Sequence, residues 1–452
     1  MQVIFSLDYY LLPIYLILFF LAVFKLRNKF NSDKSTYKIY YAGIVVRLIA
    51  ALGFACIAQY YYGYGDSLSY FDEARIFHDK IISNPANLSH FFSSVESFRS
   101  LYDPMINRVT PYLYDASNLF VIRLATIFSF FSGNTYLTTT LFFVLLSFSG
   151  MWAIFKTFTN LYPSLKNQFA WGILYLPSAS FWSSGILKDS VCIAALGWLF
   201  YCFYRFFITR ERKMKYILII ICCIYIIWTV KFYILSAFIF AFFIVGVLYL
   251  LFKLKGAFLK IIIWSTLILT VVIIIETDNK INDMLSTISV EFVVNNIKEQ
   301  QRLYSTNAEV DEGNFDIGDI DPTFSGLLNK VPAVIGNVIF RPFVWESKKL
   351  IMFFAGLENL ALMLISIYVF WKSELINFLK ILSKDILIQF CFLFVIFFAI
   401  IVGLTSFNFG SMLRYKVPCV PFYTSFLILL NYKAQIKKKL SRQLSQGILL
   451  NT

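Results

Sequence analysis

Residues 215–230 read KYILIIICCIYIIWTV, and residues 233–252 read YILSAFIFAFFIVGVLYLLF. Apart from Lys215, neither run contains a charged residue. At 1.5 Å per residue, runs of this length are what a helix needs to cross a hydrocarbon core about 30 Å thick. Only Lys231 and Phe232 separate them. The pattern predicts two membrane-spanning helices joined by a tight turn.

The composition of the whole chain agrees with these two runs. Of its 452 residues, 59% are hydrophobic and 19% aromatic, and only 15% are charged, whereas a soluble domain carries about 25% charged residues. The seven cysteines fall in or beside apolar runs, so neither a disulfide framework nor a cysteine zinc site is expected. The prediction is one all-α, polytopic integral membrane domain over residues 1–452.

Apolar runs recur along the chain and predict about eleven transmembrane helices. The first run has an acid before it and a basic cluster after it, which is the reverse of a cleavable signal, so we expect it to be retained. The predicted spans are 9–25, 41–61, 138–157, 168–184, 190–209, 215–230, 233–252, 258–275, 347–371, 386–406 and 417–432.

Charge in the connectors predicts the orientation. More than half of the 40 basic residues lie in connectors on one side of the predicted bundle, and the positive-inside rule makes that side cytoplasmic. The N-terminus is then outside and the basic tail 433–452 inside a cell (cytoplasmic) membrane, with a bacterial source expected. Two long loops, 62–137 and 276–346, lie outside. Within the first, the apolar stretch 118–132 is expected to be a juxtamembrane, re-entrant or interfacial helix.

The first outer loop opens on residues 65–70, GDSLSY, followed by Asp72 and Glu73. Asp66, Tyr70 and Glu73 recur at helical spacing and share one face. Asp66 is interpreted either as a helix N-cap, with Asp72 and Glu73 favouring the helix dipole, or as a carboxylate base. In the second interpretation it accepts a proton from an acceptor hydroxyl, while its neighbours line the substrate pocket.

An arginine-bearing helix, residues 47–52 (RLIAAL), precedes the Gly65-Asp66-x-x-x-Tyr70 motif and Ala74. This order resembles the start of the GT-C glycosyltransferases, integral membrane enzymes that use polyprenyl-phosphate-linked sugars. The resemblance implies that Asp66 is the catalytic acid, and that juxtamembrane helices follow it. It also implies transfer of a sugar from a polyprenyl-(pyro)phosphate donor to a glycan or lipid acceptor at the outer face. No cofactor or nucleic acid is expected, and no residue spacing supports a divalent metal.

Several cations lie at the predicted outer turns, where they run against the positive-inside trend. One interpretation is structural: a lysine neutralised by the next residue, a lysine that snorkels to water, and interface anchors before a span. The other is an outer basic cluster that binds the phosphate of the donor. The residues concerned are Lys188 with Asp189, Lys231, Arg341 with Glu346, Arg414 and Lys416.

Two charged residues lie inside predicted spans, and other functions remain open. Arg47 and Glu358 are expected to have partners, and a pairing with each other is favoured. A polysaccharide (O-antigen-like) polymerase or ligase of the outer leaflet would rely chiefly on Arg341 and Arg414. A lipid or glycan transporter or flippase would instead use charges near the midplane.

Overall fold

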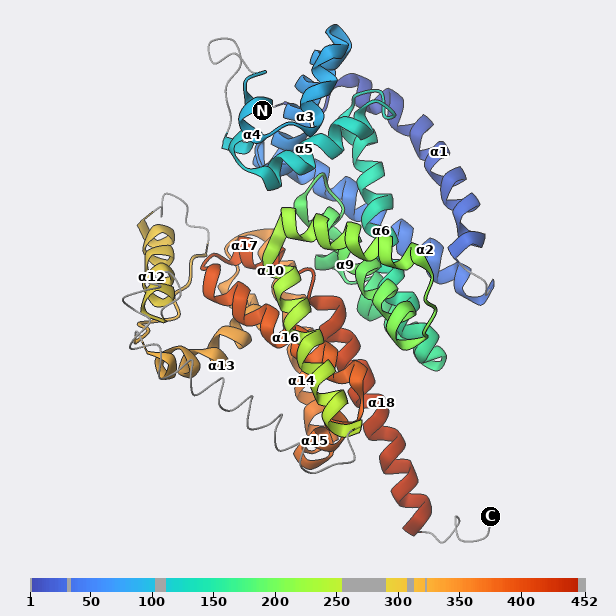
Figure 1. Cartoon of the computed structure of the whole chain (residues 1–452), viewed down its shortest axis with the longest axis vertical. Coiled ribbons are helices and arrows are strands. Elements are labelled where there is room, and N and C mark those ends of the chain that lie inside the picture. Colours follow the sequence, from blue (N-terminus) through green and yellow to red (C-terminus); the bar gives the residue numbers. More distant parts are fainter. Residues whose placement is uncertain are drawn as a thin grey trace. The chain divides into compact units, whose positions relative to one another are not determined.

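The computed structural model describes residues 2–30, 34–101, 111–253, 290–306, 313–321 and 323–445. Within these ranges the chain is helical, with connecting turns, one isolated β-bridge and no strand (Figure 1). Seven of the described helices are long and apolar enough to cross a membrane. The predicted all-helical membrane protein is therefore confirmed, whereas the count of eleven spans is not. Residues 1–235 and 236–452 form two compact units.

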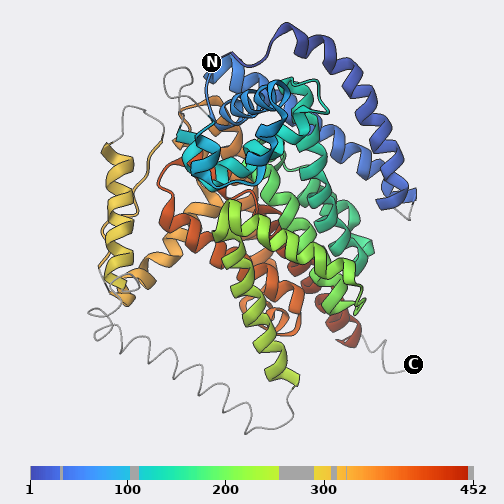
Figure 2. The same ribbon diagram turned by 45° about the horizontal axis from the view of Figure 1, so that its top comes forward.

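The first unit is built around the pair α6 and α9. Its helices are α1 (Ser6–Phe30), α2 (Tyr37–Cys56), α3 (Asp66–Ser83), α4 (Val95–Arg99), α5 (Ala116–Ser129), α6 (Tyr136–Leu161), α7 (Lys166–Phe169), α8 (Pro177–Trp182), α9 (Lys188–Phe203) and the start of α10 (Met214–Lys253). A π-helical segment, Ile57–Tyr62, continues α2, and another, Tyr204–Ile208, continues α9. In Figures 1 and 2, α3, α4 and α5 gather beyond one end of this pair.

Two glycines allow α6 and α9 to approach closely. A Cβ atom on Gly197 would lie 2.0 Å from the carbonyl oxygen of Gly150, and one on Gly150 would lie 2.4 Å from the Cα atom of Ala194. Small residues at such a crossing let two membrane helices pack backbone against backbone. Nearby, the indole nitrogen of Trp198 donates to the Ser149 hydroxyl at 3.0 Å. This pair forms the closely packed centre of the unit.

Asp8 joins α1 to α6 through backbone hydrogen bonds. Its buried carboxylate accepts from the backbone N–H of Leu137 at 2.8 Å and from that of Phe5 at 3.0 Å. The first N–H groups of a helix have no partner within the helix, so Asp8 satisfies donors at the beginning of α6. A residue 129 positions away in sequence thereby binds the first turn of α1.

The second unit packs its helices around α16. It contains the end of α10 and α12 (Val290–Thr306), α13 (Phe324–Phe340), α14 (Leu350–Ser373), α15 (Leu375–Lys384), α16 (Ile386–Thr405), α17 (Phe409–Tyr415) and α18 (Val420–Ser445). Phenylalanines form much of the core between α16 and α18, as in the 4.8 Å contact between the rings of Phe394 and Phe422. Gly403 lets α13 approach α16, because a Cβ there would lie 2.5 Å from Val334.

A short segment of the second outer loop is attached to the last predicted outer turn. The backbone N–H of Phe315 donates to the carbonyl of Phe407 at 2.9 Å, and that of Phe409 donates to the carbonyl of Gly313 at 3.1 Å. The same two segments also form the isolated bridge between Asn314 and Asn408. Two segments that the predicted topology places on the same side are therefore bonded to each other.

Most, but not all, of the predicted spans coincide with long apolar helices in the structure. Spans 9–25, 41–61, 138–157, 190–209, 347–371 and 386–406 coincide with candidate membrane helices. The span predicted at 168–184 is wrong, because the chain there forms α7, a π-helical turn and α8. The break falls before Pro177, which lacks an N–H and disfavours helix in the residue before it.

Other differences concern the long loops and the last spans. The predicted break between spans 215–230 and 233–252 is confirmed, because α10 consists of two helical segments joined by a kink at Lys231 (φ −149°, ψ 80°). That each segment crosses the membrane separately stays a prediction. The second outer loop contains α12 and α13, which the sequence did not predict. The predicted span 417–432 overlaps α18, which begins at Val420, continues to Ser445 and is not among the seven candidates. The span predicted at 258–275 lies outside the described residues.

Candidate functional site

The motif at residues 65–70 forms a turn followed by the first residues of α3. Gly63 and Gly65 have φ angles of +68° and +134°, which a residue with a side chain rarely adopts. Gly65 is the N-cap position and Asp66 is the first helical residue, so the N-cap interpretation of Asp66 is wrong. One carboxylate oxygen of Asp66 instead accepts a hydrogen bond from the hydroxyl of Tyr112 at 2.9 Å.

The predicted common face of α3 is buried against α5 and the turn before it. Tyr70 and Glu73 are both buried. The Tyr70 hydroxyl donates to the side-chain oxygen of Asn118 at 2.8 Å, and its ring meets that of Tyr112 edge to face at 5.3 Å. Asp72 lies off this face and forms an ion pair with Arg75 at 2.7 Å.

Lys188 reaches the same segment from the beginning of α9. Its amine donates to the carboxylate of Asp115 at 3.1 Å and to the hydroxyl of Ser117 at 2.5 Å. Asp115 is the N-cap of α5 and accepts from the backbone N–H of Ser117 at 3.0 Å. The expectation that Lys188 is neutralised by Asp189 is therefore wrong, because its carboxylate partner is Asp115.

Asp115 is ionised at neutral pH. Partial burial raises the pKa of its carboxyl group, but the hydrogen bonds from Ser117 and the charge of Lys188 outweigh that effect and hold the pKa below its usual value. Lys188 keeps a side-chain exposure of 16%. Within the part of the chain that the structure describes, its amine has no third hydrogen-bond or ion-pair partner.

Asp189 pairs with Lys231 inside the unit. The two groups lie 2.5 Å apart, and both side chains are almost completely shielded from solvent. The interpretation of Lys231 as a lysine that snorkels to water is therefore wrong. Its amine is held at the point where α10 leaves helical conformation, and Asp189 lies in the first turn of α9, where the helix dipole favours a negative charge.

Arg47 holds the buried connection that leads to Lys188. Its guanidinium donates to the hydroxyl of Ser147 at 2.8 Å, and to the hydroxyl and carbonyl of Ser183 at 2.9 and 3.1 Å. The chain after Ser183 is packed so closely that a Cβ on Gly185 would lie 2.7 Å from the ring of Phe54. The pairing of Arg47 with Glu358 would join the two units and stays a prediction.

These contacts bring several predicted residues of the first unit together. Asp66 and Tyr70 of α3 form hydrogen bonds with Tyr112 and Asn118, which lie before and at the beginning of α5. Lys188 of α9 binds Asp115 in the same stretch of chain. We call this set the Asp66–Lys188 network; it consists of Asp66, Tyr70, Tyr112, Asp115, Ser117, Asn118 and Lys188. It joins three segments that the predicted topology places on one side. The network thus contains a carboxylate, a cation and two phenols, of which Asp66, Tyr112 and Lys188 are partly exposed and Tyr70 is buried.

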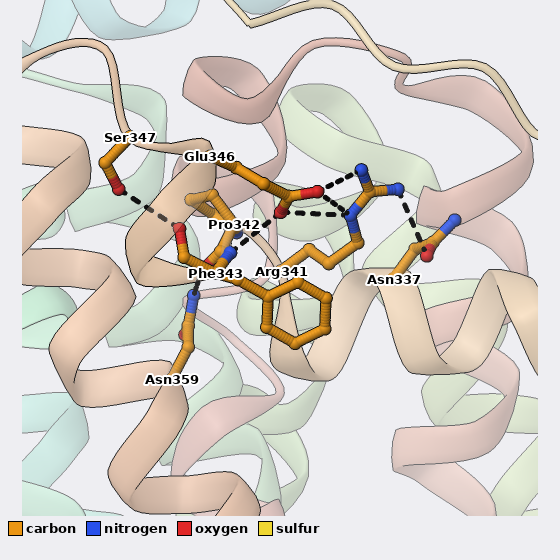
Figure 3. Close-up of polar contacts among 7 residues, drawn as sticks. All are labelled: Asn337, Arg341, Pro342, Phe343, Glu346, Ser347 and Asn359. Atoms are coloured by element: carbon orange, nitrogen blue, oxygen red, sulfur yellow. Dashed lines mark hydrogen bonds and ion pairs between the residues drawn. The ribbon is translucent and has the colours of Figure 1, made fainter.

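In the second unit, Arg341 is paired with Glu346 (Figure 3). Its Nε atom donates to both carboxylate oxygens at 2.9 and 3.1 Å, and its Nη2 atom also contacts Glu346. Glu346 further accepts from the backbone N–H of Phe343 at 2.8 Å. The guanidinium carbon lies 5.2 Å from the ring centre of Phe315 and 4.9 Å from that of Phe409. The charge of Arg341 is therefore largely compensated within the protein.

Lys416 is buried a short distance away in the same unit. Its amine donates to the side-chain oxygen of Asn359 at 2.6 Å and to the carbonyls of Ile339 and Arg341, each at 3.5 Å. Three acceptors match the three donors of an ammonium group. Burial lowers the pKa of Lys416 to about 8. The side chain thus ties α13 and α14 to the turn before α18, while Arg414 lies half-buried in the last turn of α17.

The sequence missed the residues that assemble the Asp66–Lys188 network. A signal existed for two of them, since Asp115 and Ser117 directly precede an apolar helical run, as N-cap residues do. Tyr112 and Asn118 carried no such signal. Within the described ranges, no three His, Cys, Asp or Glu side chains are grouped in a way that could hold a metal ion. Comparison with protein-family models, curated proteins and solved structures found no match to this chain.

Proposed function

We propose that the chain is a membrane glycosyltransferase of the GT-C type. It transfers a sugar from a polyprenyl-(pyro)phosphate donor to a glycan or lipid acceptor at the outer face of the membrane. The observation that supports this most is the Asp66–Lys188 network, in which a carboxylate and a lysine are attached to the same turn. Transfer from a phosphate leaving group needs one group of each kind.

Asp66 acts as the base in the proposed reaction. The acceptor hydroxyl attacks the anomeric carbon while its proton passes to the carboxylate, and the bond between that carbon and the phosphate oxygen breaks. The electron pair of the broken bond leaves with the phosphate. Tyr112 fixes the carboxylate by donating to one oxygen at 2.9 Å, and Tyr70 supports Tyr112 by ring contact.

Lys188 stabilises the charge that develops on the leaving phosphate. Two of its three N–H donors face Asp115 and Ser117, so the amine is oriented before substrate binds. Its remaining donor and partial exposure suit it to a phosphate oxygen. Two buried contacts position Lys188. Arg47 binds Ser183 in the connection before α9, and Lys231 binds Asp189 in the first turn of α9.

The decisive experiment compares Asp66→Asn with Asp72→Asn. Both replace one carboxylate of α3 by an amide, but Asp72 is engaged with Arg75 outside the network. Transfer from a polyprenyl-linked donor, measured in purified membranes, should fall about 10²–10⁴-fold in Asp66→Asn, as expected for loss of a general base. Asp72→Asn should keep most activity. Equal activity of the two variants would refute the proposed role of Asp66.

Polymerisation or ligation of lipid-linked glycans at the same face is the second candidate. The observation that favours it is the arrangement around Arg341, where an aromatic surface and Glu346 fix a guanidinium at a predicted outer turn. In that case Arg341→Ala or Arg414→Ala would abolish chain growth, whereas Asp66→Asn would not.

A further inference from the structure

Helix α15 presents an apolar face that no described residue covers. Its side chains Leu375, Ile376 and Leu379 are 73%, 67% and 53% exposed. The rest of the helix is packed: Ile381 is buried, and Phe378 meets the rings of Phe392 and Phe426 at 6.0 and 6.4 Å. The helix is therefore held firmly on α16 and α18 while its outer apolar residues remain uncovered.

The position of α15 in the chain restricts what can cover this face. It connects α14 to α16, and both of these are candidate membrane spans. A helix between two consecutive spans lies at the level where they leave the hydrocarbon core. Trp371, in the last turn of α14, is 79% exposed, and tryptophan is enriched at this boundary between membrane and water. A lipid surface therefore meets the apolar face without any rearrangement.

The charges beside the face specify the kind of lipid. Lys380 and Lys384 are exposed and, among the residues that the structure describes, form no hydrogen bond or ion pair through their amines. Neither nearby acid pairs with these lysines: Asp385 pairs with Lys433 at 2.9 Å, and Glu374 accepts from the neutral amide of Asn377 at 3.0 Å. An apolar face flanked by lysines without counter-ions matches an anionic membrane surface.

We propose that α15 is an interfacial helix that binds anionic phospholipid. Leu375, Ile376 and Leu379 enter the boundary between headgroups and acyl chains, and Lys380 and Lys384 contact the lipid phosphates. By the positive-inside distribution this is the cytoplasmic leaflet. The surface is separate from the Asp66–Lys188 network and does not depend on the proposed function.

The preference for anionic lipid is tested with the purified full chain and phosphatidylglycerol as the probe. Binding is followed by native mass spectrometry over a lipid titration, with phosphatidylcholine as the neutral comparison. Lysines near an anionic surface contribute about 1 kcal/mol each, so the double variant Lys380→Gln/Lys384→Gln should bind phosphatidylglycerol roughly 30-fold more weakly. The matched control Lys298→Gln/Lys348→Gln removes the same charge on the opposite predicted side and should stay within about twofold of wild type.

A second measurement tests insertion with the lysines intact. In Ile376→Gln/Leu379→Gln, amide hydrogen exchange over residues 375–384 should become faster in nanodiscs, while exchange in α14 stays unchanged. Equal phosphatidylglycerol binding by wild type and the lysine variant would overturn the proposal, as would unchanged exchange in the glutamine variant. A disulfide between copies of Leu379→Cys in nanodiscs would assign the face to a second copy of the chain and overturn it too.

Discussion

Lys188 and Lys416 are lysines at predicted outer turns, and their surroundings are opposite. Lys188 keeps 16% side-chain exposure and donates to two groups, one of them charged. Lys416 is 2% exposed and donates to three neutral oxygens. A lysine whose donors are all used inside the protein serves the fold, whereas one that retains a donor near solvent remains able to bind a ligand. The number of occupied donors separates the two roles better than position in the sequence does.

Replacing a third lysine, Lys231, should have the largest effect on stability. Lys231→Met would leave Asp189 buried without its cation, which typically costs about 3–5 kcal/mol of unfolding free energy. Denaturant unfolding in mild detergent measures this loss. Arg75→Met is the control, because its pair with Asp72 is partly exposed and such pairs contribute less than about 1 kcal/mol. Similar losses in both variants would mean that burial does not distinguish these cations.

Replacing Lys188 and Lys416 one at a time tests the comparison directly. Lys188→Gln should lower the turnover number for glycan transfer about 10²-fold, with little change in unfolding, because it removes a group that acts on the leaving phosphate. Lys416→Met should keep transfer within about threefold and instead lose about 1–3 kcal/mol of stability, since buried oxygens lose their donor. The reverse pattern would exchange the roles assigned to the two residues.

The helix that begins with Lys188 depends on close packing against α6. In Gly197→Ala, the new methyl group would meet the backbone of Gly150, and overpacking of this kind costs about 1–3 kcal/mol. Transfer should also fall, because α9 shifts and carries Lys188 with it. Gly246→Ala is the matched control, since a Cβ there has no atom within 4 Å. Thermal unfolding and transfer assays that showed no difference between the variants would contradict this dependence.

Lys416 should also cause a pH dependence of stability. Its pKa is about 8 in the folded protein and near 10.4 in an unfolded chain. Between these values the unfolded state binds more protons, so stability should rise as the pH increases from about 8 to about 10.4. The difference in unfolding free energy between wild type and Lys416→Met should widen over this range. A constant difference would show that Lys416 keeps one pKa in both states.

The sequence predicted what depends on long, local patterns. Apolar length located the spans now seen as α6, α14 and α16, because burial in lipid needs about 20 apolar residues regardless of their partners. Helical spacing also predicted the shared face of Tyr70 and Glu73, both of which are buried. The span at 168–184 failed because Pro177 outweighs apolar composition locally.

Pairing between distant residues could not be predicted in this way. Lys188 stands next to Asp189 in sequence, but the backbone directs the two side chains to different partners, Asp115 and Lys231. Likewise, Asp66 meets Tyr112, 46 residues away, instead of capping its own helix. Local chemistry identified which residues are unusual, and only the packing of α3, α5 and α9 determined what they contact.

The hydrogen bonds of Asp8 also constrain how the protein is made. The carboxylate in α1 accepts from the N–H of Leu137, so this contact forms only after the ribosome has synthesised α6. Until then, α1 enters the membrane with an acid that lacks this donor, at the cost of an incompletely satisfied polar group. The first helix of the chain is therefore completed late, and biogenesis of this unit follows an order different from that of its sequence.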